Sequence, residues 1–440
     1  MPEWTESLRS PINIPKFRQG TARQARRHGD LIAAVDIGGS KVACAIAALS
    51  DVGGAFEADV VGIGRTGLAR EASSAEREAA LRGAIDAAER MAGETISAVA
   101  LLVGGRFIAS RRVVVDMPLP RGVVTVEDVG DCQLEAGAFH REDRRHLLMT
   151  PIRYVLDGEA DREPPVGLAG ELLSLEAMTV DARRTAVENM SRALERCGVR
   201  VDGVLPRPMA AAAATVIEDE RELGAMVIDF GARFTEFAVF EGGAMTACGG
   251  VALGADHVTR DIAKLFGCPI AASERIKTLH GAMFAGPNDD ARIIDFPQIG
   301  DPSETARHAR SELAGVIAPR IEEIIDLTIV AASRAGAKTS SLRRVVATGG
   351  GALMLGMVES LERIVGARAR LGRPTGFLGA PEAASAPQFA ACLGGLKLIA
   401  SNAPGLAGAR QTRAIATRPP QRLQRVGGAF GIGRWLRDNF

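Results

Sequence analysis

A tight turn near the start of the chain carries the residues most able to do chemistry. Residues 31–49, LIAAVDIGGSKVACAIAAL, read as two strands joined by Asp36, Gly38, Gly39, Ser40 and Lys41. Consecutive backbone N–H groups at a glycine turn make a concave anion site, and missing side chains let a phosphate approach closely. Asp36 at the strand end can hold a hydrated Mg²⁺. The turn therefore predicts phosphate binding, although tight turns also use Asp and Gly for conformational reasons.

The same pattern returns in the second half of the chain. Residues 224–243, GAMVIDFGARFTEFAVFEGG, again read as strand, Asp-x-Gly turn and strand, with Asp229 and Gly231 in the places of Asp36 and Gly38. A repeat at this distance indicates a duplicated domain rather than a solenoid period. Two facing hairpins can clamp phosphates, and a third turn in VVATGGGAL can pass beneath a base and ribose. That turn contains Gly349, Gly350 and Gly351.

Local signals predict the elements around these turns. Two helices, Pro208–Ile217 and Pro387–Ser401, are built from very small side chains, which let two backbones cross closely. Alanine-rich packing in this alanine-rich chain would give the same composition. Capping signals predict helix starts. The other predicted elements are helices beginning near Ser73 and Thr125, helices at Asp181–Arg196 and Ala352–Val365, and a strand at Arg343–Thr348.

The order of these elements resembles the actin-like ATPase superfamily: Asp-x-Gly hairpin, small-residue helix, second hairpin, Thr-Gly-Gly turn, small-residue helix. Within it, the chain is most similar to the FtsA family of bacterial division proteins. The resemblance covers residues 31–400 and the last fifteen. The segments that carry it are Asp36–Val42, PVGLAG at 165–170, ERCGV at 195–199, EDERELG at 218–224, SERIKTLHG at 273–281, Thr348–Gly350, Trp435–Arg437 and Phe440.

The resemblance implies a fold, ligands and partners. The fold is α/β: two-lobed and actin-like (duplicated ribonuclease-H-like), with an FtsA-type inserted subdomain and a C-terminal amphipathic helix. The ligands are ATP and Mg²⁺, with Asp36 beside the metal and Glu274 and Lys277 at the nucleoside, although such a pair is also common surface charge. The partners are the tubulin-like protein FtsZ, further copies of the chain in filaments, later membrane proteins of the divisome and anionic lipid.

The resemblance and the composition shifts together predict six regions. The expected boundaries are a flexible basic arm at 1–29, a lobe 1 core at 30–106 with 182–222, an inserted subdomain at 107–181, lobe 2 at 223–401 with an FtsZ-binding insert at about 250–325, an Arg-rich linker at 402–425 and a membrane-targeting helix at 426–440.

The second hairpin departs from the family pattern Asp-x-Gly-Gly-Gly-Thr-x-Asp. Ala232, Arg233 and Phe234 replace two glycines and the threonine. We expect their Cβ atoms to be strained where the turn needs positive φ. Arg233 could contact a phosphate or point to solvent. Arg207 stands where active relatives often carry a water-positioning glutamate, and a guanidinium cannot accept a proton. We therefore predict ATP binding with slow or absent hydrolysis.

The composition limits the classes of function. The chain has 440 residues with 53 basic and 53 acidic side chains, which argues against a nucleic-acid binder. Six scattered cysteines contain no CxxC, so reduced thiols are expected. Apolar runs long enough for a transmembrane helix are missing from the sequence, as is a secretory signal at the N-terminus.

The C-terminus is predicted to bind a membrane surface. The linker contains five arginines and no acid, and VGGAFGIGRWLRDNF then segregates apolar and charged faces when drawn as a helix. Such a face with flanking arginines is typical of an interfacial helix. Docking on the chain's own body or on a partner is the alternative. The residues expected to contact lipid are Phe430, Ile432, Arg434, Trp435, Leu436, Arg437 and Phe440.

Three functions remain in competition. The first is an ATP-binding, polymerising scaffold of cell division that tethers FtsZ filaments to the cytoplasmic face of the inner membrane at the septum and recruits later proteins. The second is a sugar kinase, since Asp36–Lys41 resembles the opening of ROK kinases. A kinase needs a general base beside the sugar, and the motifs place none. The third is a pilus-assembly actin relative, which gives no reason for the C-terminal helix.

Overall fold

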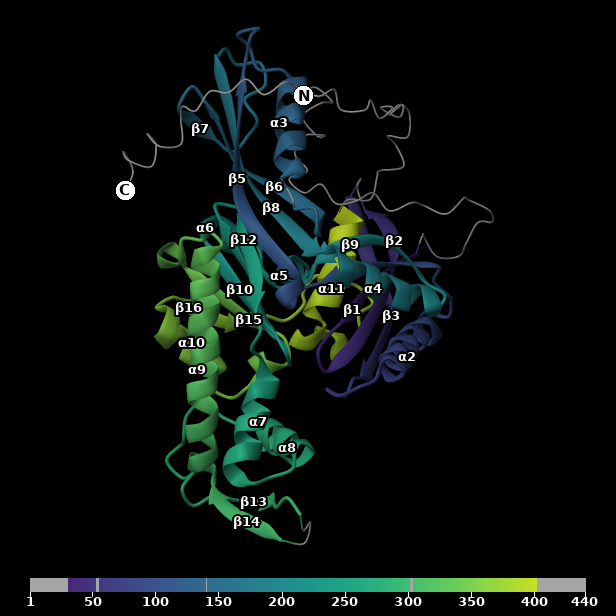
Figure 1. Cartoon of the computed structure of the whole chain (residues 1–440), viewed down its shortest axis with the longest axis vertical. Helices are drawn as coiled ribbons and strands as arrows, with labels where there is room; N and C mark the ends of the chain where they lie inside the picture. Colours follow the sequence, from purple (N-terminus) through teal and green to yellow (C-terminus); the bar gives the residue numbers. More distant parts are fainter. Residues whose placement is uncertain (1–30, 53–54, 140, 301–303, 402–440) are drawn as a thin grey trace. The chain divides into compact units, whose positions relative to one another are not determined.

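Two mixed β-sheets form the centres of two lobes (Figure 1). The structure, a computed structural model, describes residues 31–52, 55–139, 141–300 and 304–401. The basic arm at 1–29, the linker at 402–425 and the amphipathic helix at 426–440 lie outside these described residues. Within them, no helix is long and apolar enough to cross a membrane.

The first sheet contains the first Asp-x-Gly hairpin at its centre. Its strand order is β3-β2-β1-β4-β9, with β1 antiparallel to β2 and parallel to β4. Buried alanine, valine and leucine side chains fill both faces of the central strands. The strands are β1 (Leu31–Ile37), β2 (Lys41–Val52), β3 (Ala55–Gly67), β4 (Ala98–Val103) and β9 (Arg200–Pro206).

The second sheet repeats this topology. Its order is β12-β11-β10-β15-β16, with β10 antiparallel to β11 and parallel to β15. The duplication predicted from the two Asp-x-Gly turns is therefore confirmed, because each turn joins the same two positions of an equivalent sheet. The strands are β10 (Ala225–Phe230), β11 (Thr235–Glu241), β12 (Ala244–Val251), β15 (Arg344–Thr348) and β16 (Arg368–Leu371).

The two small-residue helices cross at very short distance, as predicted. They are α5 (Arg207–Thr215) and α11 (Ala390–Ser401), the latter preceded by the 3₁₀ turn η5 (Pro387–Phe389). A Cβ atom at Gly394 would lie only 1.6 Å from the backbone oxygen of Ala210. Glycine is therefore required at position 394, because any Cβ atom there would clash with the backbone of α5.

A third sheet is inserted between β4 and α4 (Arg184–Arg196). Its order is β5-β8-β6-β7, and helix α3 packs on it around a separate buried cluster that includes Val129 and Tyr154. The side chains of Thr125 and Asp128 form the capping box expected at the start of α3. The elements are η1 (Gly105–Phe107), β5 (Ile108–Pro118), α3 (Val126–Ala138), β6 (Arg144–Leu156), β7 (Glu159–Asp161) and β8 (Leu172–Arg183).

The remaining elements complete the lobes. In lobe 1, α2 (Ser74–Ala92) begins at the Ser73 capping box, as predicted. In lobe 2, the long helix α9 (Arg310–Arg334) packs beside α7 and β12. The other elements are α6 (Glu218–Leu223), α7 (Ala255–Phe266), α8 (Ile270–His280), β13 (Ile293–Pro297), β14 (Thr305–Ala309), η2 (Thr339–Ser341), η3 (Gly351–Leu353), α10 (Met357–Val365) and η4 (Glu382–Ser385).

Three predicted helix starts were wrong, and one of them is that of α11, which begins at Ala390 rather than at Pro387. The helix expected from Asp181 begins at Arg184, because β8 continues to Arg183 while pairing with β5 and β6. The helix expected from Ala352 begins at Met357, after the separate turn η3. Gly356 at its N-cap has φ of 82°, which interrupts any right-handed helix passing through it.

Candidate functional site

A cavity of about 900 Å³ lies where the two hairpin turns and the Gly-rich turn after β15 converge. Its size is within the range usual for small-molecule and cofactor sites. The structure brings every nucleotide-site residue suggested by the sequence to its wall: Asp36, Gly38, Gly39, Ser40, Lys41, Asp229, Gly231, Arg233, Glu274, Lys277, Gly349, Gly350 and Gly351.

Both hairpins close in the same way. The N–H of Gly38 donates to the Lys41 carbonyl over 2.9 Å, and the N–H of Gly231 donates to the Phe234 carbonyl over 3.1 Å. A Cβ at Gly38 would lie 2.9 Å from the Lys41 oxygen, and one at Gly231 would lie 2.7 Å from the Phe234 oxygen. The first glycine of each turn is thus needed for the hairpin to close, and both turns expose main-chain atoms to the cavity.

The altered residues of the second hairpin are not strained, contrary to the sequence-based expectation. Among the described residues, Asp157 is the one non-glycine with positive φ, so Ala232 and Arg233 adopt ordinary backbone angles. The carbonyls of this turn accept hydrogen bonds from the start of α7, with Asp256 N donating to Ala232 O over 2.8 Å. The helix N-terminus therefore supports the turn without further glycines.

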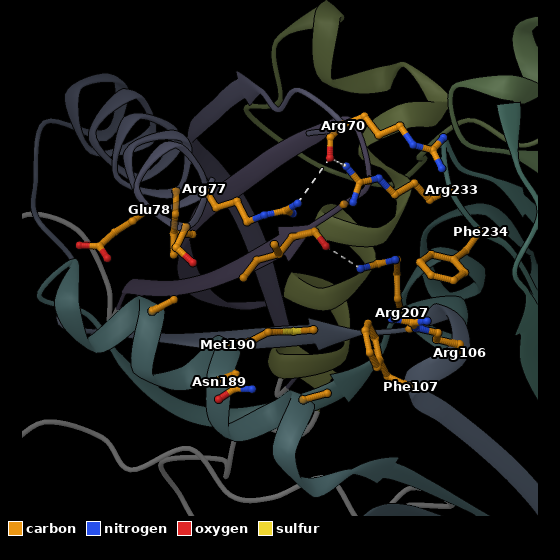
Figure 2. Close-up of a pocket in the computed structure, with 18 of the residues that line it drawn as sticks. Arg70, Arg77, Glu78, Arg106, Phe107, Asn189, Met190, Arg207, Arg233 and Phe234 are labelled. Atoms are coloured by element: carbon orange, nitrogen blue, oxygen red, sulfur yellow. Dashed lines mark hydrogen bonds between the residues drawn. The ribbon is translucent and has the colours of Figure 1, made fainter. Parts of the chain in front are cut away.

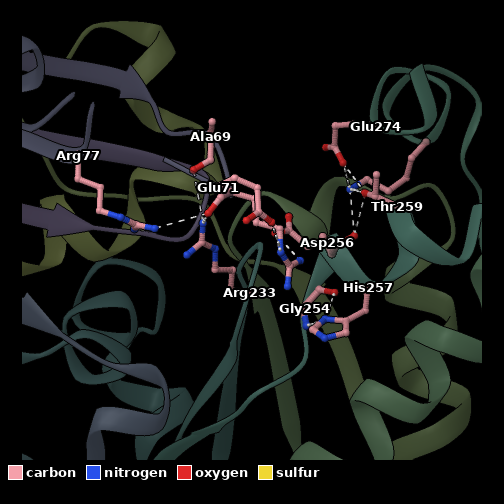
Figure 3. Close-up of polar contacts among 12 residues, drawn as sticks. Ala69, Glu71, Arg77, Arg233, Gly254, Asp256, His257, Thr259 and Glu274 are labelled. Carbon is pink, nitrogen blue, oxygen red and sulfur yellow. Dashed lines mark hydrogen bonds and ion pairs between the residues drawn. The ribbon is translucent and has the colours of Figure 1, made fainter. Parts of the chain in front are cut away.

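Arg233 reaches across the cavity (Figures 2 and 3). Its Nη2 donates to the carbonyl of Arg70 in lobe 1 over 2.7 Å. Its side chain also covers the first turn, because a Cβ at Gly39 would lie 2.7 Å from Arg233 Cγ. Burial lowers the pKa of Arg233. Arg233 therefore joins the two lobes by a backbone contact, and its contact with a phosphate stays a prediction.

Glu274 and Lys277 form one polar group with Thr259. Figure 3 shows Glu274 beside Thr259. Lys277 Nζ donates to Glu274 Oε2 over 2.6 Å, to Thr259 Oγ1 over 2.9 Å and to the Ala255 carbonyl over 3.1 Å. The Lys277 side chain is 7% exposed and that of Glu274 is 51% exposed. The lysine therefore fixes α8 against α7, while the glutamate is the more accessible member of the pair.

Lys41 connects the first hairpin to the turn η5, which leads into α11. We refer to the two small-residue helices, α5 and α11, as the hinge helices. Its Nζ donates to the Gln388 carbonyl and lies 5.3 Å from the centre of the Phe389 ring. Burial lowers its pKa, against the opposing effect of Asp36 and Asp229. A cation is thus fixed at the turn that the sequence predicts to bind phosphate.

Arg207 lies between the two hairpins and joins their carboxylates. It is the first residue of α5, and its Nε is 2.7 Å from Asp36 Oδ1 while its Nη1 is 3.0 Å from Glu236 Oε1. Its Nη2 donates to the Ile37 carbonyl over 3.0 Å (Figure 2). The side chains of Arg207, Asp36 and Glu236 are 13%, 9% and 3% exposed, so all three charges are buried.

Glu236 is a site residue that the sequence analysis did not single out. It pairs with Asp229 across the β10–β11 ladder, and its carboxylate packs so closely on Gly104 that a Cβ there would lie 2.1 Å from Glu236 Oε1. Burial raises the pKa of Glu236 to about 7 and that of Asp229 to about 6. The family pattern itself offered a signal, because its final acidic position is the one that Glu236 occupies.

Stability is expected to fall as pH rises through the ionisation of Glu236. Its pKa is about 7 in the folded chain against an ordinary value of 4.5, so between these values the folded state binds more protons than the unfolded state. The free energy of unfolding then decreases with rising pH. Between pH 4.5 and 7.5, we expect the free energy of unfolding of the wild-type chain to fall by up to about 3 kcal/mol more than that of Glu236→Gln.

Urea unfolding of both proteins at the two pH values measures this difference. Glu188→Gln is the matched control, because Glu188 is exposed on α4 and the same charge is removed there. Equal losses of stability in the wild-type chain and Glu236→Gln would show that Glu236 is ionised throughout this range.

A second cavity, of about 970 Å³, lies on the lobe 1 side of the hairpin turns (Figure 2). Gly38, Gly39, Arg207 and Arg233 line both cavities, so the turns form a partition between them. The one acidic residue in its wall, Glu78, is paired with Arg196 over 2.7 Å. The arginines in its wall are Arg70, Arg77, Arg106, Arg192, Arg196, Arg207 and Arg233.

Two equivalent sheets, two Asp-x-Gly hairpins facing one cavity and a close pair of hinge helices define an actin-like protein. A type IV pilus biogenesis complex, PilM–PilN, has the same fold: the TM-score is 0.59 at 16% identity, with 84% of this chain and 98% of that chain covered. At this identity the likeness shows the fold alone.

Comparison with known sequences identifies the family. Residues 226–394 match the family model described as "Cell division protein FtsA". The cell division protein FtsA of Agrobacterium fabrum is 30% identical over 402 residues, covering 88% of this chain and 89% of the relative. That of Rhizobium meliloti is 31% identical over 385 residues, covering 84% and 87%. The chain belongs to the FtsA family of bacterial cell division proteins.

The Mg²⁺ implied by this family does not fit the arrangement around Asp36. Mg²⁺ is usually held by one or two carboxylates together with substrate phosphates. Here the Asp36 carboxylate is paired with a buried guanidinium. We therefore assign no step to a metal.

Proposed function

We propose that the chain is a membrane-anchored, ATP-binding scaffold of bacterial cell division. It polymerises, tethers FtsZ filaments to the cytoplasmic face of the inner membrane at the septum, and recruits later divisome membrane proteins. The observation that carries this proposal is membership of the FtsA family over most of the chain. The nucleotide cleft supports ATP binding, and the amphipathic sequence at 426–440 supports attachment to anionic lipid.

ATP would act through the geometry of the lobes rather than through turnover. The phosphates would meet backbone N–H groups of both hairpins, and Lys41 is fixed beside the first turn. The first residue of α5 is Arg207, which cannot act as a base toward an attacking water. Slow or absent hydrolysis is consistent with a ligand whose binding stabilises one arrangement of the two lobes.

A single C-terminal helix would bind lipid weakly, and polymerisation would make attachment strong. Four glycines in 426–440 disfavour a helix in water, each by roughly 1 kcal/mol relative to alanine. Basic residues near an anionic leaflet contribute about 1 kcal/mol each. Many helices on one filament bind together through avidity. Assembly would therefore control membrane attachment.

The sugar-kinase and pilus-scaffold alternatives have less support. A kinase needs a general base in the cleft beside the sugar, the motifs place none, and Asp36 and Glu236 are paired with Arg207. The pilus comparison supports only a shared fold. Sugar-stimulated release of ADP from ATP would favour the kinase and contradict the scaffold.

Co-sedimentation with anionic liposomes tests the proposal. With ATP, the full chain is expected to pellet with the liposomes and to carry purified FtsZ into the pellet. A truncation after Gln424 is expected to leave both proteins in the supernatant. Trp435→Glu should behave like the truncation, because it places a charge on the apolar face.

The chain supplies a matched control for this experiment. It contains two tryptophans, and Trp4→Glu makes the same substitution in the N-terminal arm. This variant is expected to bind liposomes as the wild-type chain does. If the truncated chain still pelleted with FtsZ, the attachment would lie elsewhere and the proposed anchor would be wrong.

A further inference from the structure

We infer that Arg207 takes the place of a divalent metal ion in the nucleotide cleft, so that this chain binds its nucleotide in the metal-free form. The inference rests on the proposed nucleotide binding and specifies the chemical form of the ligand. It is carried by the ion pairs of Arg207 with Asp36 and Glu236, one from each hairpin.

Two strands, one from each hairpin, fix the Arg207 guanidinium. The Asp36 carboxylate and the Ile37 carbonyl belong to the end of β1, and Glu236 belongs to β11. The contacts are 2.7, 3.0 and 3.0 Å long, and each guanidinium nitrogen makes one of them. Removing the arginine from this position would leave Glu236, with its side chain 3% exposed, without its cation. Buried charges without partners are strongly disfavoured.

A metal ion at Asp36 would compete directly with this guanidinium. Mg²⁺ requires oxygen ligands at about 2.0–2.1 Å in near-octahedral geometry. The Oδ1 atom of Asp36 instead faces Arg207 Nε at 2.7 Å. Arginine stays protonated at all accessible pH values, and Asp36 and Glu236 already have it as their cation, so a metal ion would add further positive charge to this buried group. Metal binding at Asp36 Oδ1 therefore requires Arg207 to leave.

The fixed cations can do what a metal ion would do for the phosphates. Each terminal nitrogen of Arg207 carries two N–H groups and has one partner within the described part of the chain, so each retains a donor. Arg207 lines the cavity together with Gly38, Gly39 and Lys41. Arg207 and Lys41 thus place two cationic side chains beside the turn.

The test is the affinity of the full-length chain for a fluorescent ATP analogue, measured with excess Mg²⁺ and with excess EDTA. We expect the wild-type dissociation constants in the two conditions to agree within about threefold. The loss of one charged hydrogen bond would change the affinity by more than this. Arg207→Gln leaves Asp36 and Glu236 without their cation. We expect its affinity in EDTA to fall at least about tenfold below its affinity in Mg²⁺.

Two further variants separate charge from packing. Arg207→Lys keeps the positive charge and is expected to stay insensitive to EDTA. Arg106→Gln removes an exposed arginine from the wall of the second cavity, and it should behave as the wild-type chain does. As an independent readout, electron paramagnetic resonance of Mn²⁺ should show a nucleotide-dependent bound ion in Arg207→Gln but none in the wild-type chain.

The outcomes distinguish this inference from the proposed function. A wild-type affinity that falls tenfold or more in EDTA would overturn the inference while leaving nucleotide binding intact; Arg207 would then swing aside when the metal nucleotide enters. If the wild-type chain bound no ATP analogue in either condition, both the inference and the proposed ATP binding would be wrong. The wild-type comparison decides the question even if Arg207→Gln fails to fold.

Discussion

Replacing Gly394 with alanine is expected to destabilise the chain by about 3 kcal/mol or more, at the upper end of what overpacking a core causes. The added Cβ would lie 1.6 Å from Ala210 O, 2.6 Å from Ala210 C and 3.1 Å from Ala214 N. All three are backbone atoms of α5, so no side-chain rotation relieves the clash. The helices α5 and α11 must move apart.

This separation is expected to affect binding as well as stability. Helix α5 begins with Arg207 and α11 follows directly on the turn that accepts the Lys41 hydrogen bond. Moving the helices apart displaces both cations of the nucleotide cleft. We therefore expect Gly394→Ala to weaken ATP binding in any fraction that still folds, as measured by titration with the fluorescent analogue.

Gly315→Ala is the matched control for this prediction. Gly315 lies on an exposed position of α9, and a Cβ there meets no atom within 4 Å. Alanine in a helix interior is favoured over glycine by roughly 0.5–1 kcal/mol, so this variant should be slightly more stable than the wild-type chain. Urea unfolding measures both variants. Similar stabilities for the two would contradict the close helix crossing.

Replacing Gly349 with alanine is the second change with a large expected effect, here on ligand binding. Gly349 has φ of 83°, and a Cβ would lie 2.1 Å from Asp229 Oδ1 and 2.8 Å from the Phe230 carbonyl oxygen. Left-handed backbone costs a non-glycine residue about 1–2 kcal/mol. The Asp229 carboxylate and the β10 end would also have to shift, which disturbs the second hairpin. We expect ATP affinity to fall at least about tenfold, the equivalent of about 1.4 kcal/mol.

The neighbouring glycine provides the control. Gly350 has φ of −67°, and a Cβ there meets no atom within 4 Å. Gly350→Ala should therefore fold with wild-type stability, and any loss of affinity in it measures contact with the nucleotide rather than strain in the protein. If Gly349→Ala bound ATP as well as the wild-type chain, the turn would have no part in the site.

The amino-acid sequence by itself determined the local elements of the site. The Asp-x-Gly hairpins, the capping boxes at Ser73 and Thr125 and the small-residue hinge helices depend on contacts within a few residues or on side-chain volume. Such signals are readable without the fold, because a turn or cap needs particular residue types at fixed spacing. The duplication was readable for the same reason, since the two copies keep the same turn.

The tertiary structure alone decided how the charged residues pair. Arg207 and Asp36 are far apart in the chain and meet through the packing of α5 on the first sheet, whereas the contact of Arg233 with Arg70 depends on how the two lobes approach each other. Glu236 gained its role because the β10–β11 register and the closeness of Gly104 bury it beside Arg207. Sequence spacing cannot encode such partners, because long-range ion pairs depend on the packing of whole elements. The cations of this cleft and Asp36 were therefore visible in the sequence, but their pairing and the part played by Glu236 were not.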